Sequence, residues 1–418
     1  MKRFFNLFVA FMTLTSLHTT AQEQRLLTME EAVLGTGLAV ENLPCTWRAN
    51  GSTYTTVEEG VIYDVNPKTG LKQELTTLEK INALLGTSLK HMPPYSLTGK
   101  GTMRFYAGRE LVGIDPVADT IIHRYAIPEG AENPLYADEG RFLYTRANNL
   151  YWSDREGKEY AITTEKDKNI VSGQSVSRNE FGIMGGMFPA PDKFHVAFFQ
   201  KDESRVSTFP LLDINTRTGS LREVKYPMAG MASEHVRLGI YNYETQKTVW
   251  VEVTDFTEER YLTCITWAPD SKTIYIQVLD RSQKQMRLNA YNVADGKFLR
   301  TILEEKNEKY VEPQHALHFL KSNPDQFIYT TSNRDGFRNL YLCTLSTGGV
   351  ERLTKVDADV ELVAEHGRYL YYTSAEVSPV ENHLFRLDLK RRKTQRLTPD
   401  EGWHTVNISP DGAYFIDT

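Results

Sequence analysis

Hydrophobic and polar positions along the chain form short runs of strand length that are separated by turn residues. The clearest example is residues 140–164, in which the runs RFLYT and NLYWS are followed by a DREGK turn. Aromatic and β-branched residues in short runs, bounded by Gly, Asn and Asp, are typical of antiparallel hairpins. The apolar period of about 3.6 residues that marks amphipathic helices is not evident between residues 45 and 418. The pattern therefore predicts an all-β chain from residue 45 onward.

This strand-and-turn pattern repeats along the chain. Two further clear copies occupy residues 326–354 and 368–398, weaker copies begin at Thr53, Met103, Val196 and Thr273, and a shortened copy occupies residues 409–418. A unit of about four strands that recurs roughly every 40 to 50 residues is the signature of a β-propeller. We therefore expect an eight-bladed β-propeller over residues 44–418, with the last blade incomplete.

Two stretches interrupt the repeat. Residues 169–187 are rich in Gly and Ser, and loops that interrupt a rigid scaffold are common places for binding groups. Residues 235–253 are interpreted as an added hairpin. The phrases DVNPKTG (64–70) and DINTRTG (213–219) are interpreted as the last hairpin turns of two blades, because Asn, Pro and Gly supply turn dihedrals.

The N-terminal 43 residues differ from the rest. Residues 1–21 contain two basic residues, an apolar segment and small residues at the end, which is the pattern of a secretory signal peptide. Residues 22–43 form an N-terminal extension, in which Thr28 and Glu31 fit a capping box that begins a short helix over residues 29–34. No later apolar run approaches membrane-spanning length. We therefore expect an exported protein, periplasmic or secreted, with no membrane span.

Composition narrows the classes of partner. The chain has 48 Lys and Arg against 54 Asp and Glu, a formal net charge of −6, and one basic run at residues 389–393, so nucleic acid is not an expected partner. With 40% hydrophobic residues, the chain is expected to fold rather than to be disordered. Three cysteines allow at most one disulfide, and Cys264 and Cys343 lie in strand-like runs where buried thiols are expected.

The common catalytic motifs are missing from these 418 residues. There is no G-x-S-x-G turn that would expose a serine nucleophile, and no H-E-x-x-H zinc motif. His315 and His318 lie three positions apart in a strand-like setting, where packing or turn roles are expected. We predict no catalytic residue, metal site or cofactor. An enzyme with its own site on the propeller channel, such as a glycosidase, remains an alternative that would need two carboxylates about 5 to 10 Å apart.

Several phrases occur in an order typical of a known family: ENL (41–43), EFGI (180–183), PAPDKFHVAFFQKDESRV (189–206), YLTCITWAPDSK (261–272) and VNISPDGAYFIDT (406–418). In this order and spacing, the chain resembles the N-terminal β-propeller region of bacterial dipeptidyl peptidase IV-like serine peptidases of the prolyl oligopeptidase superfamily. The resemblance implies an eight-bladed propeller that precedes an α/β-hydrolase domain with a Ser-Asp-His triad, which releases N-terminal dipeptides after Pro or Ala. The sequence contains no such hydrolase domain.

The resemblance also implies a binding site. In the family, a Glu-Glu pair holds the amino terminus of the peptide, which fits the need of an ammonium group for carboxylates. When the family's Glu-Glu pair is aligned with this sequence by the Phe-Gly that follows the pair, it corresponds to Asn179 and Glu180. Asn179 adds no charge, and the neighbouring Arg178 would repel an ammonium or pair with Glu180. Asp202 and Glu203 also match the family, and together with Arg178 they are expected to support the loop.

Two functions remain open at this point. The first is the substrate-gating propeller of a secreted exopeptidase, which is non-catalytic by itself and depends on a hydrolase domain or chain in trans. The second is a stand-alone exported propeller that binds peptides or a protein partner, whose last blade would need completing because unpaired strand edges promote aggregation. The interrupted last repeat favours the first. Peptide is the expected ligand in both, and homodimerisation is left open.

Overall fold

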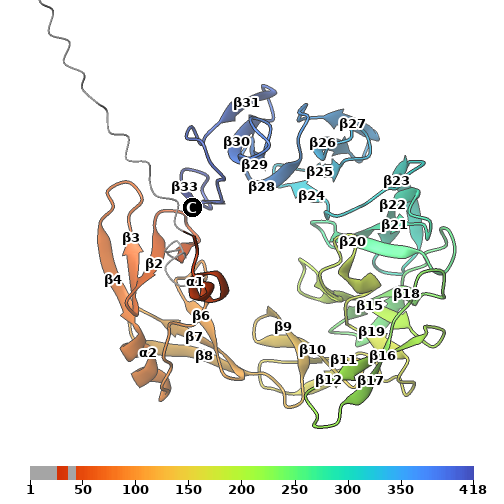
Figure 1. The fold of residues 1–418 in the computed structure, drawn as a ribbon, viewed down its shortest axis with the longest axis horizontal. Coiled ribbons are helices and arrows are strands. Elements are labelled where there is room, and N and C mark those ends of the chain that lie inside the picture. Colours follow the sequence, from red (N-terminus) through yellow and green to blue (C-terminus); the bar gives the residue numbers. More distant parts are fainter. Residues whose placement is uncertain (1–25, 36–43) are drawn as a thin grey trace, which may run out of the picture. The chain divides into compact units, whose positions relative to one another are not determined.

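The computed structural model describes residues 26–35 and 44–418 (Figure 1). The chain divides into two compact units, residues 1–43 and 44–418. The predicted signal peptide, residues 1–21, lies outside the described residues. No helix in the described ranges has the length and apolar character needed to cross a membrane.

The described part of the first unit contains helix α1 (Met29–Leu34). The Thr28 hydroxyl accepts a hydrogen bond from the Glu31 N–H at 3.1 Å, and the Glu31 carboxylate accepts one from the Thr28 N–H at 2.9 Å. Gly35 ends the helix in the left-handed conformation. The predicted capping box and helix are therefore present.

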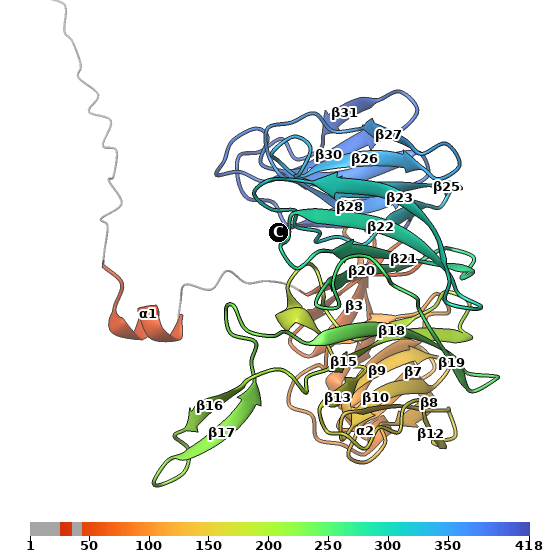
Figure 2. The same cartoon turned by 90° about the vertical axis from the view of Figure 1, so that its right-hand side faces the viewer.

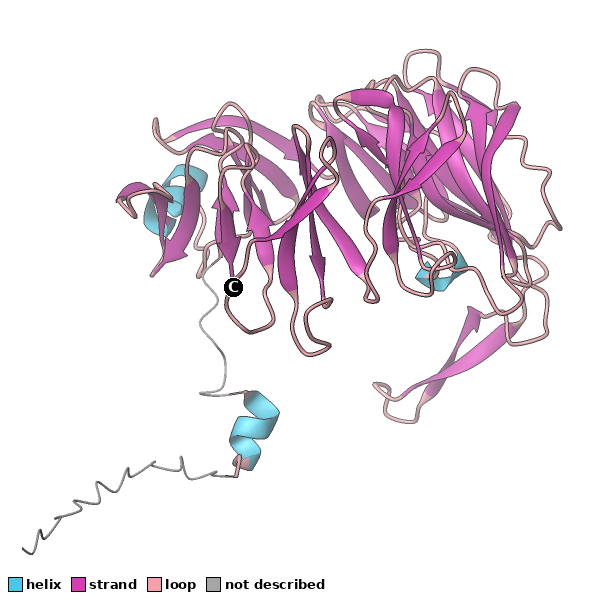
Figure 3. Cartoon of the chain, turned by 90° about the horizontal axis from the view of Figure 1, so that it is seen from above, coloured by secondary structure: helices cyan, strands magenta, loops and turns pink. Residues whose placement is uncertain are grey.

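The second unit consists mainly of antiparallel sheets that follow one another along the chain (Figure 1, Figure 3). Blade 1 contains β1 (Cys45–Trp47), β2 (Tyr54–Glu58), β3 (Val61–Val65) and β4 (Lys72–Thr77). Blade 2 contains β5 (Tyr95–Leu97), β6 (Met103–Ala107), β7 (Glu110–Asp115) and β8 (Thr120–Ala126). Blade 3 contains β9 (Glu132–Asp138), β10 (Arg141–Arg146), β11 (Asn149–Ser153) and β12 (Glu159–Ala161). Blade 4 contains β13 (Ile170–Ser172), β14 (Met187–Pro189), β15 (His195–Asp202), β18 (His235–Asn242) and β19 (Lys247–Trp250).

The remaining blades each have four strands. Blade 5 contains β20 (Tyr261–Trp267), β21 (Thr273–Leu279), β22 (Gln285–Asn292) and β23 (Phe298–Lys306). Blade 6 contains β24 (His318–Leu320), β25 (Asn323–Thr331), β26 (Asn339–Thr344) and β27 (Gly349–Arg352). Blade 7 contains β28 (Val360–His366), β29 (Tyr369–Ser374), β30 (His383–Asp388) and β31 (Lys393–Arg396). The three clear sequence repeats correspond to the last three strands of blades 3, 6 and 7.

The hydrophobic core lies between the blades. Six clusters of buried side chains each join two consecutive blades, so every seam from blade 1 to blade 7 is filled. In β10, Phe142 and Tyr144 pack toward blade 2, whereas Leu143, between them, packs toward blade 4. Both faces of such a strand are buried, which explains why RFLYT is apolar throughout instead of alternating with polar residues.

The prediction of eight blades is wrong for the described residues, which form seven blades. After blade 7, residues 399–418 supply only β32 (Val406–Ile408) and β33 (Phe415–Asp417), which pair with each other. The indole N–H of Trp47 in blade 1 donates to the Asn407 carbonyl at 3.0 Å, and the Tyr371 hydroxyl of blade 7 donates to the Gly412 carbonyl at 3.1 Å. The shortened repeat therefore lies between the first and the seventh blades as a two-stranded sheet.

Two local predictions are also wrong. Residues 235–253 are not an added hairpin, because β18 pairs along its whole length with β15 and is mostly buried. The added hairpin consists of β16 (Thr208–Asp213) and β17 (Ser220–Lys225), which pair only with each other and project from the blades (Figure 2). The DINTRTG phrase (213–219) forms the turn of this added hairpin. It is not the last hairpin turn of a blade, as the sequence had suggested. Both segments are strand–turn–strand in sequence, and only burial against blade 4 distinguishes them.

The all-β prediction missed helix α2 (Leu78–Leu85), which follows blade 1. The Thr77 hydroxyl caps it by accepting from the Lys80 N–H at 3.1 Å, and Ile81 and Leu85, four residues apart, are buried. The spacing of Ile81 and Leu85 is the helical signal that the sequence analysis overlooked. The expectation for the cysteines is confirmed, since Cys264 and Cys343 are free, buried thiols.

Candidate functional site

The loop predicted to carry binding groups interrupts the first strand position of blade 4. β13 pairs with the end of β15, and β14 pairs with its beginning, so residues 173–186 leave the sheet between two segments bound to the same strand. We call residues 173–186 the site loop. Its two ends meet at Phe199, whose carbonyl accepts from the Gly173 N–H at 2.8 Å and whose N–H donates to the Gly186 carbonyl at 3.0 Å. The loop is therefore closed at its base by the strand on which it is built.

The middle of the site loop is a tight turn in an unusual conformation. Ser177, Arg178 and Asn179 have φ values of 51°, 56° and 64°, and Phe181 has φ 55°. Successive left-handed residues other than Gly are uncommon, cost free energy, and persist only where the surroundings enforce them. Backbone strain of this kind is concentrated at functional sites, which marks this turn as a candidate.

Buried apolar side chains hold the turn in place. Val176, Phe181 and Ile183 are 1%, 7% and 3% exposed, and the Phe181 ring lies 4.8 Å from the ring of Tyr261 in blade 5. Of the four polar residues between Val176 and Phe181, Ser177 is half-buried and the other three are exposed: Arg178, Asn179 and Glu180. The anchors therefore present the predicted site residues to solvent on a fixed backbone.

Two glycines let the site loop pack against its neighbours. A Cβ atom on Gly182, which has φ 69°, would lie 2.1 Å from the backbone oxygen of Gln314, and one on Gly186 would lie 2.1 Å from that of Gln174. No side chain can occupy either position without a backbone shift. In contrast, a Cβ atom on Gly185 would meet nothing within 4 Å.

The side chains of the turn point to different partners. The guanidinium of Arg178 lies 4.5 Å from the ring centre of Tyr226, and it forms no ion pair with Glu180 in the described structure. The Asn179 side-chain oxygen accepts a hydrogen bond from the Ser175 hydroxyl. The Glu180 carboxylate has no hydrogen-bond or ion-pair partner among the described residues. The alternative in which Glu180 pairs with Arg178 is therefore not the arrangement seen here.

A carboxylate that the sequence analysis missed lies beneath the turn. Glu234, whose side chain is 10% exposed, accepts a hydrogen bond from the Ser177 N–H at 2.6 Å. Lys201 lies between Glu234, at 3.5 Å, and Glu203, at 2.6 Å. Glu203 and Glu234 therefore share the ammonium group of Lys201. Glu234 is 57 residues from Ser177 in sequence and belongs to no motif, so only the fold brings it here.

Asp202, the last residue of β15, stabilises the following turn. Its carboxylate accepts from the Ser204 N–H at 2.8 Å, and hydrogen bonds from the Ser204 side chain and backbone lower the pKa of Asp202 below its usual value. Asp202 is thus an ionised carboxylate engaged within its own loop. It does not approach the turn of residues 177–180 through any hydrogen bond or ion pair in the described structure.

Two cavities flank this region. One, of about 510 Å³, is largely apolar and is bounded by residues 182–186 of the site loop, by Met187 and Phe188 of β14, and by Leu135, Cys264 and Ala316. The other, of about 400 Å³, is polar and is lined by Lys201, Asp202, His235, Arg237, Glu258 and Arg260. Residues directly after Glu180 therefore line an apolar space large enough for a side chain of a ligand.

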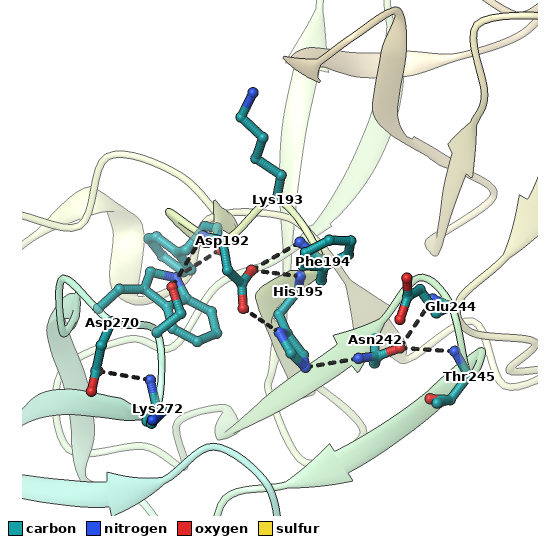
Figure 4. Close-up of polar contacts among 12 residues, drawn as sticks. Asp192, Lys193, Phe194, His195, Asn242, Glu244, Thr245, Asp270 and Lys272 are labelled. Carbon is teal, nitrogen blue, oxygen red and sulfur yellow. Dashed lines mark hydrogen bonds and ion pairs between the residues drawn. The ribbon is translucent and has the colours of Figure 1, made fainter.

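The turn after β14 contacts blade 5, where the Ser271 hydroxyl accepts a hydrogen bond from the Asp192 N–H at 3.1 Å. The Asp192 carboxylate also contacts His195 of its own blade (Figure 4). Asn242 donates to Nε2 of His195 at 2.8 Å, because its oxygen already accepts from the Glu244 and Thr245 N–H groups. With Nε2 as an acceptor, Nδ1 of His195 is the ring nitrogen that donates to the Asp192 carboxylate, at 2.7 Å. Both ring nitrogens therefore have partners within blade 4, and this His-Asp pair stabilises the turn between β14 and β15.

Comparison with known protein families agrees with the resemblance seen in the sequence. The model of a family described as "Dipeptidyl peptidase IV (DPP IV) N-terminal region" matches residues 132–418. The chain belongs to this family. The resemblance found in the sequence is thus confirmed, and the matched residues contain blades 3 to 7.

Relatives of the family are longer than this chain. A dipeptidyl-aminopeptidase B from Aspergillus niger is 25% identical in an alignment of 308 positions, which covers 65% of this chain and 34% of the relative. A crystal structure described as a dipeptidyl aminopeptidase IV from Bacteroides ovatus has a TM-score of 0.80 and 30% identity, and covers 90% of this chain and 57% of that one. The crystal structure of Porphyromonas gingivalis dipeptidyl peptidase 4 has a TM-score of 0.75 and 21% identity, which shows a shared fold. The match covers 94% of this chain and 58% of that one. The chain spans about one third of the length of the curated relative and somewhat more than half of the solved structures.

Proposed function

We propose that this chain is the substrate-admitting propeller of an exported dipeptidyl peptidase, and that Glu180 binds the free amino terminus of the peptide, with Asn179 as a neutral hydrogen-bond acceptor. The observation that supports this most is the exposed, unpartnered carboxylate of Glu180 on a strained and anchored turn. An ammonium group satisfies such a carboxylate by charge-assisted hydrogen bonds. Beneath the turn, Glu234 and Glu203 share one cation, Lys201, which leaves one net negative charge in the group that contacts Ser177.

In this proposal the bond cleavage is performed by a hydrolase domain or chain outside these 418 residues, because no G-x-S-x-G serine is present. The propeller contributes positioning: the amino terminus is held at Glu180, and the adjacent apolar cavity receives part of the peptide. The alternative of a stand-alone binding propeller requires the same peptide site and differs only in lacking a hydrolase partner.

Glu180→Gln is expected to weaken binding of a peptide that begins with Ala-Pro about tenfold, because one charge-assisted contact at an exposed site contributes roughly 1.4 kcal/mol. Fluorescence anisotropy with a labelled peptide measures this. The same peptide with an acetylated amino terminus should bind the native chain as weakly as the free peptide binds the variant. Glu129→Gln, an exposed Glu in the linker between blades 2 and 3, is the matched control. Equal affinity of native chain and Glu180→Gln for the free peptide contradicts the proposal.

We also propose that the chain forms a homodimer through the hairpin of β16 and β17. A two-stranded hairpin is at best marginally stable by itself in water. Leu212 and Leu221, which face each other across its strands, are 65% and 70% exposed, and Ile214 in its turn is 78% exposed. Covering these residues with the same hairpin of a second copy would remove this apolar surface from water.

Leu212→Asp combined with Leu221→Asp is therefore expected to convert a dimer into a monomer, as measured by light scattering after size-exclusion chromatography. Leu71→Asp, at an exposed apolar position of blade 1, is the control and should leave the mass unchanged. A monomeric native chain at micromolar concentration, or a dimer that survives both substitutions, would refute the proposed interface.

A further inference from the structure

A cavity of about 350 Å³ lies in the seam between blades 2 and 3, on elements different from those of the site loop. It is lined by Pro94, Tyr95, Ser96, Arg104, Phe105, Tyr106, Leu111 and Tyr136. Most of this lining is aromatic or apolar, and one charged group, the guanidinium of Arg104, is part of it. The cavity therefore combines largely aromatic and apolar walls with a single cationic group.

The guanidinium of Arg104 is unusual in having no polar partner. Its Nε is buried, and the group makes no hydrogen bond or ion pair with any of the described residues. Its contact is with the ring of Tyr136, whose centre lies 5.4 Å from the guanidinium carbon. A half-buried cation without an anion or carbonyl loses hydration without compensation, so such groups normally have a partner.

A second polar group without a partner lies on a neighbouring strand of the same blade. Arg104 on β6 pairs with Gly113 on β7, which pairs with His123 on β8, so the three residues form one row across the sheet. Because Gly113 has no side chain, the His123 ring occupies its place; a Cβ there would lie 2.2 Å from Cε1 of the ring. The Nε2 atom of His123 is also buried without a partner among the described residues. Burial and then the charge of Arg104 lower the pKa of His123, so its imidazole does not add a second positive charge beside Arg104.

We propose that this cavity is a binding site for an organic carboxylate with a flat, apolar body, whose carboxylate is bound by Arg104 and whose body packs against Tyr106 and Tyr136. Arginine binds carboxylates through two parallel N–H donors, whereas a neutral amide offers one uncharged acceptor oxygen and an amidinium offers none. The aromatic walls favour a planar body over a bare inorganic anion. No acidic side chain lines the cavity to oppose an anion.

Benzoate is the probe, with benzamide as its neutral isostere and benzamidinium as its cationic one. Ligand-observed NMR titration of the full chain is expected to show saturable binding of benzoate at least tenfold tighter than of benzamide, and none of benzamidinium. Inorganic phosphate at the same concentration should not displace benzoate. Equal binding of benzoate and benzamide, no binding of benzoate, or displacement by phosphate would each overturn the proposal.

Arg104→Gln should reduce the affinity for benzoate at least tenfold, whereas Arg217→Gln, which removes the same charge from an exposed turn, should not change it. Thermal unfolding monitored by circular dichroism verifies that both variants are folded. If Arg104→Gln does not fold, the comparison of benzoate with benzamide on the native chain decides the matter. Unchanged benzoate binding in a folded Arg104→Gln variant contradicts the assignment.

Discussion

Gly182→Ala is expected to lower the free energy of unfolding by about 2 kcal/mol or more and to disorder the site loop. The left-handed conformation at this position costs a residue with a Cβ roughly 1 to 2 kcal/mol. The new methyl group would also lie 2.1 Å from the Gln314 backbone oxygen, which cannot rotate away as a side chain could. The loop must therefore move away from the chain segment that precedes blade 6, and the turn that carries Glu180 moves with it.

Urea unfolding and limited proteolysis measure the two consequences of Gly182→Ala. Proteolysis should introduce a new cleavage within residues 173–186, and peptide affinity should fall with it. Gly185→Ala is a matched control in the same loop, because its Cβ would meet nothing within 4 Å and no left-handed φ is required there. Identical stability and proteolysis of the two variants would show that the close approach at Gly182 does not fix the loop.

Arg334→Met is expected to destabilise the propeller by about 2 to 3 kcal/mol, because it leaves a buried carboxylate without its cation. Glu305, on β23 of blade 5, is 3% exposed and accepts from Nε of Arg334 at 3.1 Å and from the Thr331 hydroxyl at 2.8 Å. Breaking a fully buried ion pair by removing one partner costs more, but the Arg334 side chain is 35% exposed, so solvent screens part of the interaction. This contact joins blades 5 and 6.

The double variant Arg334→Met with Glu305→Gln tests whether the unpaired Glu305 carboxylate causes this loss of stability. Replacing the unpaired carboxylate by a neutral amide should restore part of the lost free energy of unfolding. In urea unfolding, the double variant should therefore have a stability between those of Arg334→Met and the native chain. A double variant that is less stable than Arg334→Met would show that loss of packing of the Arg334 stem, and not the uncompensated charge, explains the effect.

The repeats show what local sequence could determine. Strands such as RFLYT in β10 are recognisable because both of their faces are buried between blades, which makes the whole run apolar. The N-cap at Thr28 and the turn at residues 64–70 depend on a few adjacent residues and were predicted for that reason. The family was recognised from the order of short phrases, of which EFGI also located the exposed turn at Glu180.

Features that depend on distant contacts were not determined by the sequence alone. Whether β16 and β17 or β18 and β19 belong to blade 4 is decided by burial against β15, because both pairs have the pattern of a hairpin. The number of blades was overestimated because the last repeat has strand character but only two strands. Glu234 beneath Ser177 and the partnerless guanidinium of Arg104 arise from tertiary packing and register. The sequence by itself determined the repeating strands and the family; the tertiary structure decided which strands pair and which charged groups meet, because those energies belong to contacts between residues far apart in the chain.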